Sequence, residues 1–121
     1  PISTAKPAWI DAEIGRASKR FAEIFSGKPT AFAAPGWKSH RHALRLTQRM
    51  GLSYASDSRG SHPFIPVIDG EIVACPQLPT TLPTLDELLV LEPRYSPEQA
   101  VDRIAQLANA IAAEKEMGDG C

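Results

Sequence analysis

Prolines divide this sequence into regions that have different folding options. Five of them fall within residues 58–83: Pro63, Pro66, Pro76, Pro79 and Pro83. Because the proline ring fixes φ and removes a backbone donor, this stretch cannot form a long helix. Within it, residues 65–68 and 71–75 flank Asp69-Gly70, a dipeptide typical of two-residue hairpin turns. We therefore predict a Pro-rich segment over residues 58–83 that contains a β-hairpin.

Upstream of this segment, helical periodicity alternates with short apolar runs. Residues 7–25 predict an amphipathic helix that Gly27 and Pro29 end, and residues 39–50 a second helix with Gly51 as its stop. Residues 30–34 and 52–56 predict short buried strands. This order is typical of an α/β protein with a parallel sheet covered by helices. The first helix is expected to bury Ile10, Ile14, Ala17, Phe21 and Ile24 or Phe25, and the second Ala43, Leu46, Thr47 and Met50.

Two helix-start signals follow the Pro-rich segment. Thr84 precedes acidic residues and predicts the cap of a short helix. The string Ser96-Pro97-Glu98-Gln99 is a capping box with proline at the first helical position. It predicts a last helix through about residue 116, with an inward face made of Val101, Ile104, Leu107 or Ala108, and Ile111.

Length and charge exclude several classes of protein. The chain has 121 residues, enough for one domain, and 13 basic against 14 acidic residues give a net charge of −1. That balance argues against a nucleic-acid binder, which needs a basic surface. No apolar run approaches the roughly 20 residues of a membrane-spanning helix. Cys75 and Cys121 lie far apart without a CxxC motif, which is typical of a reducing compartment.

Candidate site residues follow both predicted strands, where parallel α/β proteins bind ligands. After the first strand come Pro35, Gly36, Trp37 and Lys38. Trp37 can stack on a sugar ring while a backbone N–H of this turn holds an oxyanion, or Trp37 can simply pack on the next helix. Asp57 and Arg59 follow the second strand and point the same way in extended chain. They can hold a substrate hydroxyl or phosphate, or form a structural ion pair that closes the loop.

His40 and His42 form the one H-x-H pair of the sequence. Residues two apart on a helix point about 200° apart, so these side chains cannot share a metal there. We expect two solvent-facing helix residues and no metal ligand among them.

Three strings, in this order and spacing, carry a family resemblance. They are Ala33-Ala34-Pro35-Gly36-Trp37-Lys38, Tyr54-Ala55-Ser56-Asp57-Ser58-Arg59-Gly60 and Leu82-Pro83-Thr84-Leu85-Asp86-Glu87. Over nearly its whole length the chain resembles the polysaccharide deacetylase (NodB-homology) superfamily. Within that superfamily it is most similar to the bacterial 4-deoxy-4-formamido-L-arabinose-phosphoundecaprenol deformylases.

The resemblance implies a fold and a chemistry. The fold is a distorted β/α-barrel, of which residues 1–121 are the central part, with residues 58–83 as a Pro-rich hairpin insertion. The activity is metal-dependent hydrolysis of a sugar N-formyl group, in a pathway that modifies lipid A and links the family to polymyxin resistance. The divalent metal ligands and a late histidine are expected outside this chain, before Pro1 and after Cys121. The isolated chain is therefore expected to be inactive.

For the site, the resemblance implies substrate-side residues: Trp37, Lys38, Asp57 and Arg59, with an oxyanion donor in the turn Pro35-Gly36-Trp37. Lys38 is a candidate substitute for an arginine that the wider superfamily has near position 33. The implied partner is a lipid-linked amino sugar, and the implied location is the bacterial cytoplasm or the cytoplasmic face of the inner membrane. Two alternatives stay open: another N-acetyl sugar deacetylase of the superfamily, or a non-enzymatic sugar-binding module built around Trp37.

Overall fold

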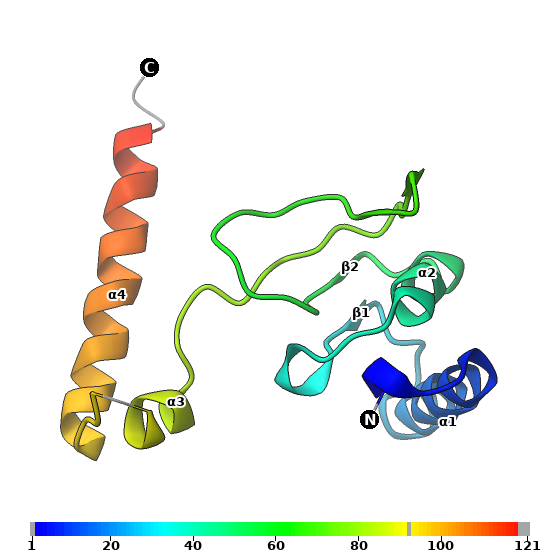
Figure 1. Cartoon of the computed structure of the whole chain (residues 1–121), viewed down its shortest axis with the longest axis horizontal. Coiled ribbons are helices and arrows are strands. Elements are labelled where there is room, and N and C mark those ends of the chain that lie inside the picture. Colours follow the sequence, from blue (N-terminus) through cyan, green and yellow to red (C-terminus); the bar gives the residue numbers. More distant parts are fainter. Residues whose placement is uncertain (1, 92, 119–121) are drawn as a thin grey trace. The chain divides into compact units, whose positions relative to one another are not determined.

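The computed structural model describes residues 2–91 and 93–118, which divide after Thr80 into two compact units (Figure 1). The first unit holds two helices, a pair of parallel strands and a hairpin; the second is a pair of helices. The prediction that the whole chain belongs to one barrel-type domain stays a prediction. Cys121 lies outside the described residues.

The first unit opens with a 3-10 turn, η1 (Ile2–Thr4), and the helix α1 (Pro7–Phe25), whose predicted bounds are confirmed. Proline suits the first helical turn because its missing N–H has no intrahelical partner there. The helix ends when Ser26 adopts a left-handed conformation with φ of 55°. The predicted stop at Gly27 was therefore one residue late, because the positive φ that ends the helix already occurs at Ser26.

A parallel sheet joins the two predicted strands. β1 (Ala31–Phe32) pairs with β2 (Tyr54–Ala55) in the register Ala31 with Tyr54 and Phe32 with Ala55. Both strands are shorter than predicted, and the helix α2 (Arg41–Arg49) connects them. The C-cap of this helix is Met50, and Gly51 directly after it has a φ of 66°, which confirms the predicted stop. The parallel β-α-β unit that the alternating pattern predicts is thus present.

The Pro-rich segment adds a third parallel chain and a hairpin. Beside β2, the N–H of Ala55 donates to the Pro76 carbonyl and the N–H of Leu78 to the Ala55 carbonyl, both at 2.8 Å. The predicted hairpin is confirmed as β3 (Val67–Ile68) and β4 (Glu71–Ile72). Its turn residues Asp69 and Gly70 have φ of 52° and 80°, as a type I′ turn requires.

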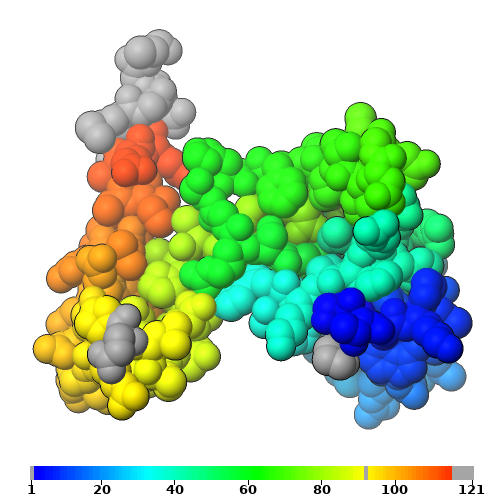
Figure 2. All heavy atoms as spheres, in the orientation of Figure 1, coloured from blue at the N-terminus to red at the C-terminus, as the bar shows by residue number. Residues whose placement is uncertain are grey.

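Salt bridges and a hydrogen bond fix the hairpin against α2. Asp69 accepts from Arg41 and Arg45, and the Ala74 N–H donates to Oε1 of Gln48 at 2.6 Å. In the space-filling view, the green hairpin lies directly against the blue-green surface of α2 (Figure 2). The Pro-rich segment is therefore an ordered part of the first unit.

Two small apolar clusters form the core of the first unit. One contains Leu52, Ala55, Ile68, Val73 and Cys75, and the other Ile10, Ile14 and Ala43. The second cluster confirms the inward residues of the first half of α1. In α2, Ala43 and Thr47 are buried as predicted, while Leu46 and Met50 are half-buried.

The second half of the apolar face of α1 is not buried. Phe21, Ile24 and Phe25 are 39%, 57% and 65% exposed, and Ala17 is exposed as well, so the prediction that they point into the core was wrong. The helix packs on α2 near its start, and its later turns extend beyond this contact. There they border an apolar groove of about 190 Å³ beside β1.

The second unit consists of α3 (Leu85–Val90) and α4 (Pro97–Gly118), which pack on each other. Both predicted caps are confirmed: Thr84 and Glu87 form a reciprocal capping box, and so do Ser96 and Gln99. The predicted inward Val101 is 59% exposed, because the helix is rotated so that its neighbour Ala100 is fully buried. Within the described residues, no helix has both the length and the apolar content needed to cross a bilayer.

Candidate functional site

Asp57 joins three chain segments at the carboxyl edge of the parallel sheet. This residue is 5% exposed and follows β2. Oδ1 accepts from the N–H of Ala34, just after β1, at 2.9 Å, and Oδ2 accepts from Nε2 of Gln77 at 3.0 Å. The Asp57 N–H donates back to Oε1 of Gln77 at 2.9 Å. The side chain therefore fixes both strand ends to the Pro-rich segment.

Burial dominates the titration of this carboxyl group. Loss of solvent raises the pKa of Asp57 above its ordinary value of 3.8, although the hydrogen bonds from Gln77 and Ala34 act in the opposite direction. Both carboxylate oxygens already accept hydrogen bonds from protein groups. Asp57 is thus built to hold the edge together, and its oxygens face the protein interior.

The turn after β1 carries an unusual backbone. It is the short 3-10 element η2 (Pro35–Trp37), in which Gly36 and Trp37 have φ of 59° and 54°. Glycine adopts this left-handed region freely, whereas an aromatic residue rarely does. Of the backbone N–H groups, that of Trp37 donates to the Ala34 carbonyl at 3.1 Å and that of Lys38 to the Pro35 carbonyl at 3.3 Å. Pro35 has no N–H. The N–H of Gly36 is therefore the one backbone donor of this turn without a recorded acceptor among the described residues.

The indole of Trp37 is held from two sides. Its Nε1–H donates to Oγ1 of Thr80 at 3.1 Å, and the guanidinium carbon of Arg59 lies 4.4 Å from the ring centroid. A guanidinium over an indole face at this distance forms a favourable cation–π contact. One face of the Trp37 ring is therefore in contact with the Arg59 guanidinium.

The structure brings together most of the predicted site residues. Trp37, Asp57 and Arg59 lie at one edge of the sheet, with Trp37 in direct contact with Arg59. Lys38 is exposed and next in sequence to this contact. The prediction missed Gln77 and Thr80, which hold Asp57 and Trp37. Their signal in the sequence is faint: both are polar side chains within an extended run punctuated by prolines.

The described residues do not supply a metal centre. No group of three His, Cys, Asp or Glu side chains gathers anywhere in residues 2–91 and 93–118. The prediction that His40 and His42 face solvent on a helix was wrong, since both are partly buried and engaged. His40 caps α2 by accepting the His42 N–H at Nδ1, and Nε2 of His42 lies 2.7 Å from Oδ1 of Asp11.

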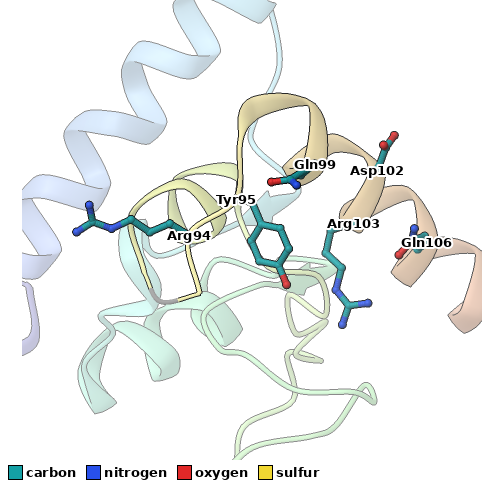
Figure 3. A pocket seen from close by; sticks show the side chains of 6 residues that line it. All are labelled: Arg94, Tyr95, Gln99, Asp102, Arg103 and Gln106. Atoms are coloured by element: carbon teal, nitrogen blue, oxygen red, sulfur yellow. The ribbon is translucent and has the colours of Figure 1, made fainter.

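A hollow of about 400 Å³ lies in the second unit, lined by Arg94, Tyr95, Gln99, Asp102, Arg103 and Gln106 (Figure 3). Figure 3 shows the side chains of Arg94 and Arg103 extending in different directions, with Asp102 turned to the opposite side from the Tyr95 hydroxyl. The charged groups do not converge on one point, so this hollow lacks the geometry of a specific anion site.

Comparison with known proteins gives two informative relatives, and no protein-family model matches the sequence. Over 61 residues, half of this chain, it is 43% identical to a protein of Wigglesworthia glossinidia brevipalpis. Over 84 residues, 69% of the chain, it is 38% identical to a protein of Shewanella sediminis (strain HAW-EB3). The matched segments span 21% and 26% of these two relatives, about a quarter of their length or less. Both are named probable 4-deoxy-4-formamido-L-arabinose-phosphoundecaprenol deformylase ArnD, so this chain is similar to part of two proteins with that name.

Proposed function

We propose that this chain is the central part of an enzyme that removes the N-formyl group from a 4-formamido-arabinose linked to undecaprenyl phosphate. The observation that carries the proposal is the 43% and 38% identity to parts of two proteins with that printed name. The cluster of Trp37, Asp57 and Arg59 at the carboxyl edge of parallel strands supports it, because α/β enzymes bind substrate at that edge. We further propose membership of the polysaccharide deacetylase superfamily, with a distorted β/α-barrel as the complete domain.

Arg59 is the residue best suited to bind the substrate. A phosphate-linked sugar offers anionic oxygens and hydroxyl groups, and a planar guanidinium can donate two parallel hydrogen bonds to either. The contact with Trp37 at 4.4 Å orients the guanidinium in advance of binding. The Trp37 ring thus supports the Arg59 guanidinium on one face. Lys38, which follows Trp37 in the sequence, adds a second exposed cation. Asp57 keeps the edge in register without touching the substrate.

Hydrolysis of an amide needs a stabilised oxyanion. The N–H of Gly36 is the candidate donor, because those of Trp37 and Lys38 donate within their own turn. A divalent metal ion in such an enzyme polarises the acyl carbonyl and activates water. The described residues do not fit a metal, so we propose that its ligands belong to other parts of the full-length protein. The proposed location is the bacterial cytoplasm or the cytoplasmic face of the inner membrane.

The test is an assay of the full-length protein that contains this chain, supplied with divalent metal. One reaction contains the undecaprenyl-phosphate-linked formamido-arabinose, and a second contains an N-acetylglucosamine oligomer. Release of formate from the first substrate is the expected result. Turnover of only the oligomer refutes the choice of substrate and favours another deacetylase of the superfamily. Binding of sugar without hydrolysis of either substrate favours a non-enzymatic module.

A further inference from the structure

We propose that Thr80 is a positioning residue that fixes the Trp37 turn and the Arg59 guanidinium in the arrangement that receives substrate, an inference that rests on the proposed function. Thr80 lies 43 positions from Trp37 in the sequence, within the Pro-rich segment. Its hydroxyl reaches the indole Nε1 at 3.1 Å.

The turn needs an anchor from outside its own sequence. Gly36 and Trp37 are consecutive left-handed residues, with φ of 59° and 54°. This conformation suits Gly36 but is disfavoured for Trp37, whose Cβ crowds the backbone there. Such a conformation persists when the surrounding structure overdetermines it. Within the turn, the N–H groups of Trp37 and Lys38 donate to the Ala34 and Pro35 carbonyls, and neither of these bonds involves the Trp37 side chain.

Two side-chain contacts hold Trp37, and only the first of them requires tryptophan. One is the hydrogen bond from Nε1 to Thr80, and the other is the stacking of Arg59 on the ring. A phenylalanine at position 37 would keep a ring for Arg59 but lose the donor. The hydrogen bond to Thr80 therefore fixes the rotation of the indole plane, which in turn sets the direction in which the guanidinium faces. It also helps to hold the peptide orientation at Gly36.

Thr80 is itself tied to the segment that carries Arg59. Its N–H donates to the Ser58 carbonyl at 2.9 Å, and its carbonyl accepts from the Gly60 N–H at 3.4 Å. These two bonds flank Arg59, which pairs with Thr80 in a parallel bridge. One residue thus contacts the Trp37 ring through its side chain and, through its main chain, the backbone on both sides of Arg59.

The first experiment measures the anchor in the 121-residue chain. The sequence has two tryptophans, so a proton–nitrogen correlation spectrum contains two indole signals, which Trp9→Phe assigns. Thr80→Val removes the hydroxyl and preserves the shape, Thr80→Ser keeps the hydroxyl, and Thr81→Val is the control at the exposed neighbour. We expect Thr80→Val alone to shift the Trp37 indole proton upfield and to speed its exchange with solvent. An unshifted Trp37 signal in Thr80→Val overturns the proposal.

The second experiment measures positioning in the full-length enzyme. Loss of one hydrogen bond corresponds to about a three- to tenfold effect, so Thr80→Val should lower kcat/KM by about that factor. Thr80→Ser should stay within twofold of the wild type, and Thr81→Val should be unchanged. A Thr80→Val enzyme with wild-type kcat/KM, or a Thr80→Ser enzyme as impaired as Thr80→Val, overturns the positioning role.

The two experiments separate this inference from the function on which it rests. If the wild-type enzyme releases no formate, the proposed function fails, and the indole spectrum alone decides whether Thr80 anchors Trp37. If the enzyme is active and only the kinetic effect is missing, the proposed function stands and Thr80 has no positioning role.

Discussion

Replacing Asp57 with alanine tests the most heavily bonded part of the sheet edge. The carboxylate accepts from the Ala34 N–H at 2.9 Å and from Nε2 of Gln77 at 3.0 Å, and the residue is 5% exposed. Asp57→Ala leaves both donors buried without their acceptor. Asp57→Asn keeps an acceptor for Ala34 but turns an amide nitrogen toward Gln77, so one of the bonds is lost.

The expected magnitude follows from two opposing terms. Hydrogen bonds to a charged group contribute about 1.5–3 kcal/mol each to the free energy of unfolding. Burial of the charge acts against them, since desolvation raises the pKa of Asp57 in spite of both bonds. We therefore expect a net loss of about 2 kcal/mol for Asp57→Ala and about 1 kcal/mol for Asp57→Asn.

Urea unfolding followed by tryptophan fluorescence measures this loss. Both tryptophans, Trp9 and Trp37, belong to the first unit, so their signal reports the unit that contains Asp57. With a slope of about 1–3 kcal/mol per molar urea, the midpoint of Asp57→Ala should fall by about 1 M. The control Glu23→Gln removes an exposed i,i+3 ion pair to Arg20, which contributes less than about 0.5 kcal/mol. If Asp57→Ala is no less stable than Glu23→Gln, the reasoning about the edge is refuted.

Four further predictions concern pH, two glycines, a helix cap and the isolated chain. Because the native pKa of Asp57 is raised above 3.8, the native state binds a proton at this carboxyl group more tightly than the unfolded chain does. The resulting gain in the free energy of unfolding is complete below pH 3.8 and is lost as pH rises through the native pKa. The stability of the wild type minus that of Asp57→Asn should fall across that window in urea titrations, and a rising difference contradicts the pKa shift. Gly51→Ala, at a φ of 66°, should destabilise the protein by about 1 kcal/mol. Gly15→Ala, within α1 and with open space for a methyl group, should stabilise it by about 0.5–1 kcal/mol. Melting temperatures that change in the same direction for both variants would contradict this reasoning. Thr84→Ala should remove the capping box of α3, at about 1 kcal/mol, and speed amide exchange at Glu87 and Leu88, while unchanged exchange counts against the cap. The 121-residue chain should release no formate from the lipid-linked substrate, and metal-dependent release by it would contradict the placement of the metal ligands elsewhere.

Local signals in the sequence predicted the elements that depend on few neighbours. The bounds of α1, the turn at Asp69-Gly70 and both capping boxes follow from residues within a few positions of each other. In each of these features, the residue types themselves strongly prefer the observed backbone conformation or hydrogen bond. The parallel pairing of β1 with β2 was also predictable, because a short helix between two apolar runs permits few other arrangements.

Periodicity did not reveal how much of an apolar face another element covers. It correctly identified the stripe on α1, yet Phe21 and Phe25 remain exposed because the packing partner contacts only the first half of the helix. On α4, Ala100 and Val101 are adjacent apolar residues, and only the contact with α3 determines which one faces inward. Burial depends on tertiary packing, which single-chain periodicity does not contain.

The clustering of the candidate residues was predictable from the sequence, but the hydrogen bonds and contacts that hold them were not. Trp37, Asp57 and Arg59 follow the ends of the predicted strands, and the structure brings them together at one edge of the sheet. The alternative of an ion pair between Asp57 and Arg59 is not the recorded arrangement: Asp57 accepts from Ala34 and Gln77, and Arg59 stacks on Trp37. Gln77 and Thr80 reach these residues from 20 and 43 positions away. No local pattern encodes such long-range contacts.

The kinetics of Arg59→Gln in the full-length enzyme test the central claim most directly, namely that this edge is the substrate side of a deformylase. Arg49→Gln, an exposed arginine at the end of α2, is the matched control. Loss of a charge-assisted contact to the substrate corresponds to about a ten- to hundredfold change in affinity. We expect the wild type and Arg49→Gln to release formate from the lipid-linked formamido-arabinose, and Arg59→Gln to have a KM raised at least tenfold. Absence of formate release by the wild type, or an unchanged KM in Arg59→Gln, would contradict this claim.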